Sequence, residues 1–135
     1  MNASFALQWV LRLIGGIELC AIPFLLFPVP WMAEVHEKGL GLGPLPRERI
    51  VEYLARSLSA VYAVHGAVVF FVSFDVVRYR PLIGFLGAIH VVLGATILAI
   101  DAVSGLPWWW VMGEGPGIAV GGLLVLLLNR GPRAV

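Results

Sequence analysis

Four long apolar stretches, separated by short polar or Gly/Pro-rich connections, account for nearly the whole chain. They cover residues 5–27, 53–74, 82–100 and 108–128. A run of at least about 18 apolar residues is long enough to cross the hydrocarbon core of a bilayer as a helix. The pattern therefore predicts an all-α integral membrane four-helix bundle, formed by residues 1–135 as a single domain.

Proline and glycine mark irregular places in this pattern. Pro23 lies inside the first span and predicts a kink, because proline cannot donate the helical hydrogen bond. In the connection 28–46, apolar and polar residues alternate over 31–37, which predicts a short surface helix or loop between spans 1 and 2.

The fourth span is predicted to be interrupted by Gly and Pro at residues 113–117. The uninterrupted remainder, 118–128, is only about 17 Å long as a helix, whereas the bilayer core is about 30 Å thick. Either this span is continuous and locally distorted, or residues 108–112 lie at the interface and a partial helix begins near Pro116.

Composition agrees with a membrane protein. The chain is 60% hydrophobic and 13% charged, against about 25% charged residues in soluble domains. The net charge of +1 gives no reason to expect a nucleic-acid partner. Cys20 is the single cysteine, so an internal disulfide is excluded. The N-terminus has no basic segment or cleavage motif, so the first stretch is predicted to be a retained span.

Basic residues predict the orientation. The side that holds both termini and the turn between spans 2 and 3 carries Arg78, Arg80, Arg130 and Arg133, with Arg12 able to snorkel there. The connection between spans 3 and 4 has no Lys or Arg, although three basic residues in the first connection weaken the contrast. We therefore expect both termini to be cytoplasmic, in a bacterial-type inner membrane, with Trp108–Trp110 in the outer aromatic belt.

Ionisable residues inside the spans are the candidate functional residues, because charge is expensive in hydrocarbon. The candidate ligand-binding residues are Glu18, Arg56, His90, Asp101 and Glu114. All but His90 belong to the outward half, and these four come from four different spans. They predict an outward-facing buried polar pocket, with Glu18 and Glu114 as polar contacts and Arg56 as their charge partner. A quinone, an isoprenoid or a lipid would enter it from the bilayer.

Each of these residues also has a plainer interpretation. Glu18 could make a structural hydrogen bond, and Arg56 could snorkel and pair with Glu52 four residues earlier. Asp101 could cap or solvate the end of the third helix. Glu114 could lie beside a helix N-terminus, where a carboxylate is favoured.

Histidines and glycines leave two further alternatives open. His65 and His90 lie at similar depth in consecutive antiparallel spans, an arrangement that can hold haem b or a metal, but that also suits neutral histidines with core hydrogen bonds. No cofactor is predicted. The stripe Gly113, Gly117 and Gly121 predicts close helix packing, either within the bundle or in a homo-oligomer.

The sequence resembles the DoxX-like membrane proteins. The likeness rests on Arg12-Leu13 with Gly15-Gly16, on Tyr53–Arg56 with Gly66, on Gly94 with Asp101, and on the Gly-Glu-Gly-Pro segment. The cysteine-containing signatures of some members are absent. The resemblance implies a four-helix bundle, often quinone- or redox-associated or an accessory subunit.

Three functions follow from these expectations. The first is a small polytopic protein that binds a lipophilic molecule in the outward pocket. The second is a structural or accessory subunit whose glycine stripe and surface helix contact a partner membrane subunit. The third is a lipid-modifying isomerase or hydrolase, which needs two titratable groups within reach of one substrate atom.

Overall fold

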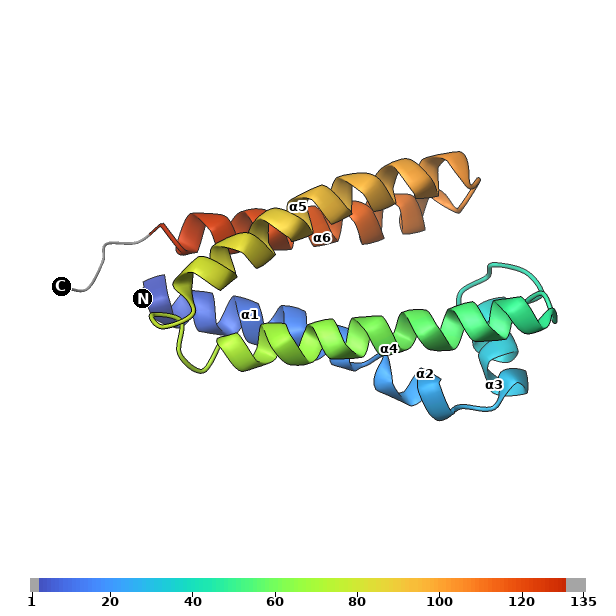
Figure 1. Ribbon diagram of the computed structural model, residues 1–135. Coiled ribbons are helices and arrows are strands. Elements are labelled where there is room, and N and C mark those ends of the chain that lie inside the picture. Colours follow the sequence, from blue (N-terminus) through green and yellow to red (C-terminus); the bar gives the residue numbers. More distant parts are fainter. Residues whose placement is uncertain (1–2, 131–135) are drawn as a thin grey trace. The chain divides into compact units, whose positions relative to one another are not determined.

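The computed structural model describes residues 3–130, which contain helices and no strands. The elements, in chain order, are α1 (Ala3–Leu19), α2 (Ile22–Leu26), α3 (Val29–Glu34), the π-helix η1 (Val35–Gly39), α4 (Arg49–Val72), α5 (Arg80–Val103) and α6 (Trp108–Leu128) (Figure 1). Arg133, which contributed to the predicted orientation, lies outside the described residues.

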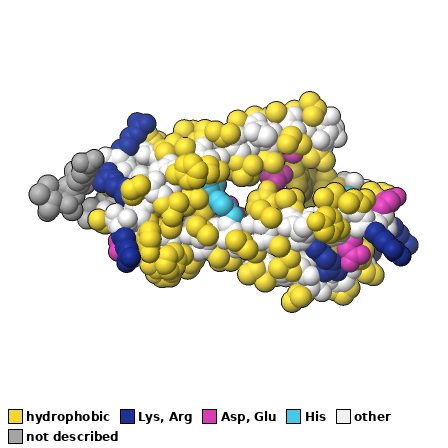
Figure 2. Space-filling view, viewed as in Figure 1, with side chains coloured by type: hydrophobic (Ala, Val, Ile, Leu, Met, Phe, Trp, Pro, Cys, Tyr) yellow, Lys and Arg dark blue, Asp and Glu magenta, His cyan; other side chains and the backbone are white. Residues whose placement is uncertain are grey.

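Four helical stretches are long and apolar enough to cross a bilayer: Ala3–Leu26, Arg49–Val72, Arg80–Val103 and Trp108–Leu128. Hydrophobic side chains cover much of the visible helix surface (Figure 2). In water such a surface would be unfavourable, whereas in hydrocarbon it is matched to its surroundings. The predicted all-α fold is confirmed, with four helices that by length and composition could cross a membrane.

The chain divides into two compact units, which we describe separately. Unit 1 comprises Met1–Ile14 and Val68–Val135, and unit 2 comprises Gly15–Ala67. The boundary falls inside α1 and α4, so each of these helices contributes to both units.

Unit 1 contains the main apolar core, to which all four spans contribute. Its buried members are Leu7, Leu11, Val69, Val72, Val76, Ile83, Leu86 and Val125. Within each helix these positions recur three or four residues apart, which places them on one face. Four-helix packing is therefore a property of unit 1 itself.

Glycines bring the backbones of α5 and α6 into direct contact. A Cβ atom added at Gly94 would lie 2.5 Å from the carbonyl oxygen of Gly115, and one added at Gly122 would lie 2.6 Å from that of Gly87. Membrane helices associate largely through such close van der Waals packing, for which small residues are needed. These four glycines fix the α5–α6 hairpin.

The stripe Gly113, Gly117 and Gly121 is not part of this contact. A Cβ added at Gly113 or Gly117 would meet nothing within 4 Å, and one added at Gly121 would meet the side chain of Ile14. Gly113 and Gly117 therefore take no part in the packing of α6 against α5, and their packing elsewhere stays a prediction. The packing glycines of α6 lie on its other face.

Of the two alternatives for the fourth span, the structure shows the continuous one: α6 runs through Pro116 as one helix, so the expected Gly/Pro interruption is absent. Proline crowds the Cβ of the preceding residue when that residue is helical, and here the preceding residue is Gly115, which has none. Gly115 also packs against α5. A Cβ atom added to it would lie 2.6 Å from the backbone nitrogen of Leu98. Packing against α5 therefore keeps the helix continuous at a position where the local sequence predicts a break.

The first span breaks earlier than Pro23. Helix α1 ends at Leu19, a turn follows at Cys20 and Ala21, and α2 begins with Pro23 in its first turn. Pro23 cannot donate to the carbonyl four residues before it, at Leu19, so the helix ends there. The predicted kink is confirmed, and it begins four residues upstream.

In unit 2, the connection after α2 forms the expected short helix, as α3 and η1. His36 Nδ1 donates to the carbonyl oxygen of Gly43 at 2.8 Å, which closes the following loop. Gly41 and Gly43 have positive φ angles of 64° and 81° there, a conformation that strains other residues.

We expect Gly115→Ala to destabilise the protein by about 1–3 kcal/mol, since the added methyl group overpacks a backbone contact. The matched variant Gly117→Ala adds the same methyl group to the open face of α6 and should leave stability unchanged or raise it. Unfolding in mixed detergent micelles measures both. Equal effects of the two variants would contradict the described α5–α6 contact.

Candidate functional site

In unit 2, Glu18 pairs with His65. The Nδ1 atom of His65 lies 2.8 Å from Oε2 of Glu18, and the two side chains are 29% and 13% exposed. Glu18 belongs to the last turn of α1 and His65 to the second half of α4. The sequence had identified both residues as candidates without pairing them.

Gly66 explains why this pair forms. A Cβ at Gly66 would lie 2.7 Å from the Cβ of Glu18 and 2.9 Å from the carbonyl oxygen of Gly15. Helices α1 and α4 therefore touch beside the pair, and the short distance lets the two side chains meet. The carboxylate orients the imidazole, an arrangement found both in structural hydrogen bonds and next to metal-binding histidines.

Arg56 has a structural role in unit 2. Its Nε atom donates to Glu52 at 3.1 Å, and its two terminal nitrogens donate to the backbone carbonyls of Leu25 and Phe27. These carbonyls are at the C-terminal end of α2, where a cation is favoured and unpaired carbonyls need donors. The predicted pairing of Arg56 with Glu52 is thus confirmed. Arg56 does not pair with Glu18.

His90 is a buried residue of α5 in unit 1. It is 4% exposed, and its Nδ1 donates to the Leu86 carbonyl at 2.8 Å. The Cβ of His90 also packs against α6. A Cβ atom added at Gly122 would lie 2.8 Å from it. The interpretation as a histidine with a core hydrogen bond fits these contacts.

Asp101 does not fit the plainer interpretation, in which it would cap or solvate the end of the third helix. It lies in the last turn of α5 and is only 5% exposed, so it does not solvate the helix end as that interpretation required. Among the described residues, its Oδ2 atom is buried with no hydrogen-bond partner. Leaving a buried polar group unsatisfied costs about 1–3 kcal/mol, and more for a charged one.

Glu114 lies in the second turn of α6 and accepts a hydrogen bond from Nε1 of Trp110, one turn earlier. Because α6 is continuous, Glu114 is not beside a helix N-terminus created by Pro116, and that interpretation is wrong. Its neighbour Gly115 packs against Leu98, which lies one turn before Asp101 in α5, so both acids lie near the closed end of the hairpin. Unit 1 thus holds an acid pair where the α5–α6 hairpin closes.

The five sequence-predicted residues therefore make three kinds of contact. Asp101 and Glu114 form the acid pair, Glu18 pairs with His65, and Arg56 and His90 satisfy backbone carbonyls. The predicted pocket draws on residues of both units, so its existence stays a prediction. The joint action of His65 and His90, which belong to different units, stays a prediction for the same reason.

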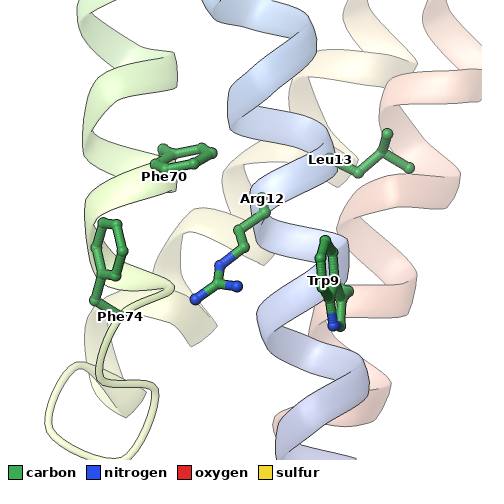
Figure 3. Close-up of a pocket in the computed structure, with 5 residues that line it drawn as sticks. All are labelled: Trp9, Arg12, Leu13, Phe70 and Phe74. Carbon is green, nitrogen blue, oxygen red and sulfur yellow. The ribbon is translucent and has the colours of Figure 1, made fainter.

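A pocket at the other end of unit 1 was not predicted. It is lined by Trp9, Arg12, Leu13, Phe70 and Phe74 and has a volume of about 570 Å³ (Figure 3). From the sequence, Arg12 is expected to snorkel and to form part of the DoxX-like motif, but not to bind a ligand. Aromatic residues four apart, at 70 and 74, were the available signal, since that spacing places them on one helix face.

Comparisons of the sequence with protein families and with curated proteins, and of the fold with solved structures, find no match to this chain.

We expect a double-mutant cycle on Glu18 and His65, with Glu18→Ala and His65→Ala, to give a coupling energy of about 1 kcal/mol or more, because the pair is largely shielded. The matched cycle on Glu52 and Arg56, which are more exposed, should give about 0.3–0.5 kcal/mol. Unfolding free energies in mixed micelles provide both values. A Glu18–His65 coupling no larger than the control would show that the pair contributes little to stability.

Proposed function

We propose that this protein binds a lipophilic molecule that carries a hydrogen-bond donor, and that Asp101 and Glu114 are its polar contacts. The single observation that supports this most is the buried Oδ2 of Asp101, which lacks a partner among the described residues. Buried polar groups in proteins are almost always paired. A ligand hydroxyl would supply the missing donor.

The position of Asp101 argues against a purely stabilising role. A carboxylate in the last turn of a helix faces the negative end of the helix dipole, which is unfavourable. Its neighbour Glu114 adds a second acid and no positive charge. Local electrostatics thus disfavour an acid at this position. Ionisable residues that destabilise a membrane span in this way are candidate functional residues.

The chemistry of the pair restricts the ligand. Two carboxyl groups accept hydrogen bonds or a proton, so the ligand must present a hydroxyl or another donor. Asp101 is about 3 Å from the end of α5 by helical rise, near the depth at which amphiphile headgroups lie. A quinol or an isoprenoid alcohol meets both conditions. Because Oδ2 is closed off in this structure, binding requires the Asp101 side chain to rotate.

A second candidate function is that of an accessory subunit. It is supported by the open face of α6 at Gly113 and Gly117, where added Cβ atoms would meet nothing. A partner helix could approach closely at such a stripe. This function and ligand binding use different faces of α6 and are compatible.

The proposed location is a bacterial-type inner membrane with both termini in the cytoplasm. The described turn between α4 and α5, the segments next to it and the end of α6 carry four arginines and one aspartate, namely Arg12, Arg78, Arg80, Arg130 and Asp75. The connection 104–107 has no charged residue. Basic residues remain preferentially on the cytoplasmic side.

Asp101→Asn should abolish the stabilisation of the purified protein by a short-chain ubiquinol or by farnesol. In the wild type, a ligand at about 100 times its Kd should raise the free energy of unfolding by about 2.7 kcal/mol. Asp75→Asn, in the exposed α4–α5 turn, is the control and should keep the effect. Thermal unfolding in detergent with and without each probe is the measurement, and equal stabilisation of wild type and Asp101→Asn would overturn the proposal.

Reporter fusions test the orientation. A green fluorescent protein fused after the full chain should fluoresce, and alkaline phosphatase at the same position should be inactive, because the C-terminus remains in the cytoplasm. Fusions after Ser104, which follows the third span, should give the reverse pattern. Active phosphatase at the C-terminus would contradict the assignment.

A further inference from the structure

The second site of interest is the aromatic groove, which we define as the pocket lined by Trp9, Arg12, Leu13, Phe70 and Phe74. All five residues belong to unit 1, and they come from α1, from the end of α4 and from the turn that follows (Figure 3). The groove lies at the end of unit 1 opposite to the acid pair, because it adjoins the start of α5 and the acid pair adjoins its end. It takes no part in the proposed function.

Arg12 is held within the groove and keeps donors for a ligand. Its Nε lies 3.4 Å from Oγ of Ser73, and its guanidinium carbon lies 5.4 Å from the Trp9 ring centre and 5.5 Å from that of Phe74. Among the described residues, the Nε bond is its only hydrogen bond. The two terminal nitrogens, which present the fork that suits phosphate oxygens, remain available.

The remaining walls of the groove are apolar and open to the surroundings of the helices. Trp9, Leu13 and Phe74 are all exposed in the structure. Contacts with Ser73 and Phe74 place the guanidinium level with the end of α4, a helix long and apolar enough to span the bilayer. An arginine at this depth reaches the headgroup layer, while Leu13 and Phe70 lie farther from the ends of the helices and toward the hydrocarbon (Figure 3).

The positive charge around the groove favours an anionic ligand. Arg78 is exposed and stacks over Tyr79, with 5.6 Å between its guanidinium carbon and the ring centre, and Arg80 and Arg130 lie at the same end of unit 1. Asp75 is the only described acid there, and its carboxylate accepts from the Arg78 backbone. Several dark blue side chains are visible at this end in Figure 2. An excess of arginine at a membrane surface attracts anionic lipids.

We propose that the aromatic groove binds an anionic phospholipid of the bilayer, with the lipid phosphate on the terminal nitrogens of Arg12 and an acyl chain along Leu13 and Phe70. The acyl chain accounts for the apolar walls, which a soluble anion would not use. The phosphate accounts for the arginine, which a purely apolar ligand would leave unpaired. This inference rests on the placement of the spans in a bilayer and is independent of the acid pair.

The test compares lipid binding to the full chain in detergent micelles by native mass spectrometry. Wild type should bind dioleoyl phosphatidylglycerol in preference to dioleoyl phosphatidylcholine. Arg12→Gln should reduce that preference about fivefold, and Arg12→Lys should restore part of it. Arg49→Gln, which changes an exposed arginine at the start of α4 among residues of mixed charge, is the control and should bind as wild type does.

An unchanged preference in Arg12→Gln would overturn the proposal. Displacement of the lipid by inorganic phosphate at millimolar concentration would also overturn it, because the groove would then be a site for a soluble anion. A loss of lipid binding in Arg49→Gln as well would indicate a general defect and count against a specific groove.

A second measurement needs no variant and covers the case in which Arg12→Gln does not fold. A photoactivatable phosphatidylglycerol, cross-linked to the wild-type protein in vesicles of phosphatidylcholine, should label the segments 9–13 and 70–74 preferentially. Label distributed evenly over the four spans would overturn the proposal.

Discussion

Hydrocarbon cannot donate or accept hydrogen bonds, so each polar group on a helix that crosses a bilayer needs a partner within the protein. The structure meets this need locally in most places. His65 pairs with Glu18, Arg56 covers the carbonyls that end α2, and His90 donates to the carbonyl one turn before it. Asp101 is the exception, because its buried Oδ2 has no partner among the described residues. The proposed ligand site follows from that one departure.

Backbone proximity is the means by which these contacts are made. Gly66 lets α4 approach α1 beside the Glu18–His65 pair, and Gly94 and Gly115 do the same between α5 and α6. Apolar side chains gain little from one another in lipid, which is equally apolar, so shape and close approach determine which helices associate. The glycines therefore position the polar residues as well as the helices.

The two ends of the α5–α6 hairpin differ in charge. At the closed end, Asp101 and Glu114 form an acid pair beside an uncharged connection. At the other end, Arg80 and Asn129 exchange hydrogen bonds of 2.7 and 3.1 Å between side chains and backbone carbonyls, and Arg12 lies in the aromatic groove. Such a separation suits a protein whose ends meet different membrane surfaces, since the cytoplasmic leaflet is the more anionic.

The sequence by itself determined the class and the positions of the elements. Length and hydropathy of the apolar runs predicted four spans, because those properties depend on composition within a single helix. Pro23 likewise predicted a kink in the first span, since a missing N–H acts locally; the structure places the break four residues upstream, after Leu19. The same local argument failed at Pro116, where packing of Gly115 against α5 keeps the helix intact.

Only the tertiary structure decided which polar residues meet. Glu18 contacts His65 and not Arg56, and the packing glycines of α6 are Gly115 and Gly122 and not the stripe that begins at Gly113. The aromatic groove likewise joins residues about 60 positions apart. The physical reason is that the rotation of each helix about its own axis depends on close contacts with its neighbours. These helices are apolar on nearly all sides, so the sequence pattern does not determine their rotation.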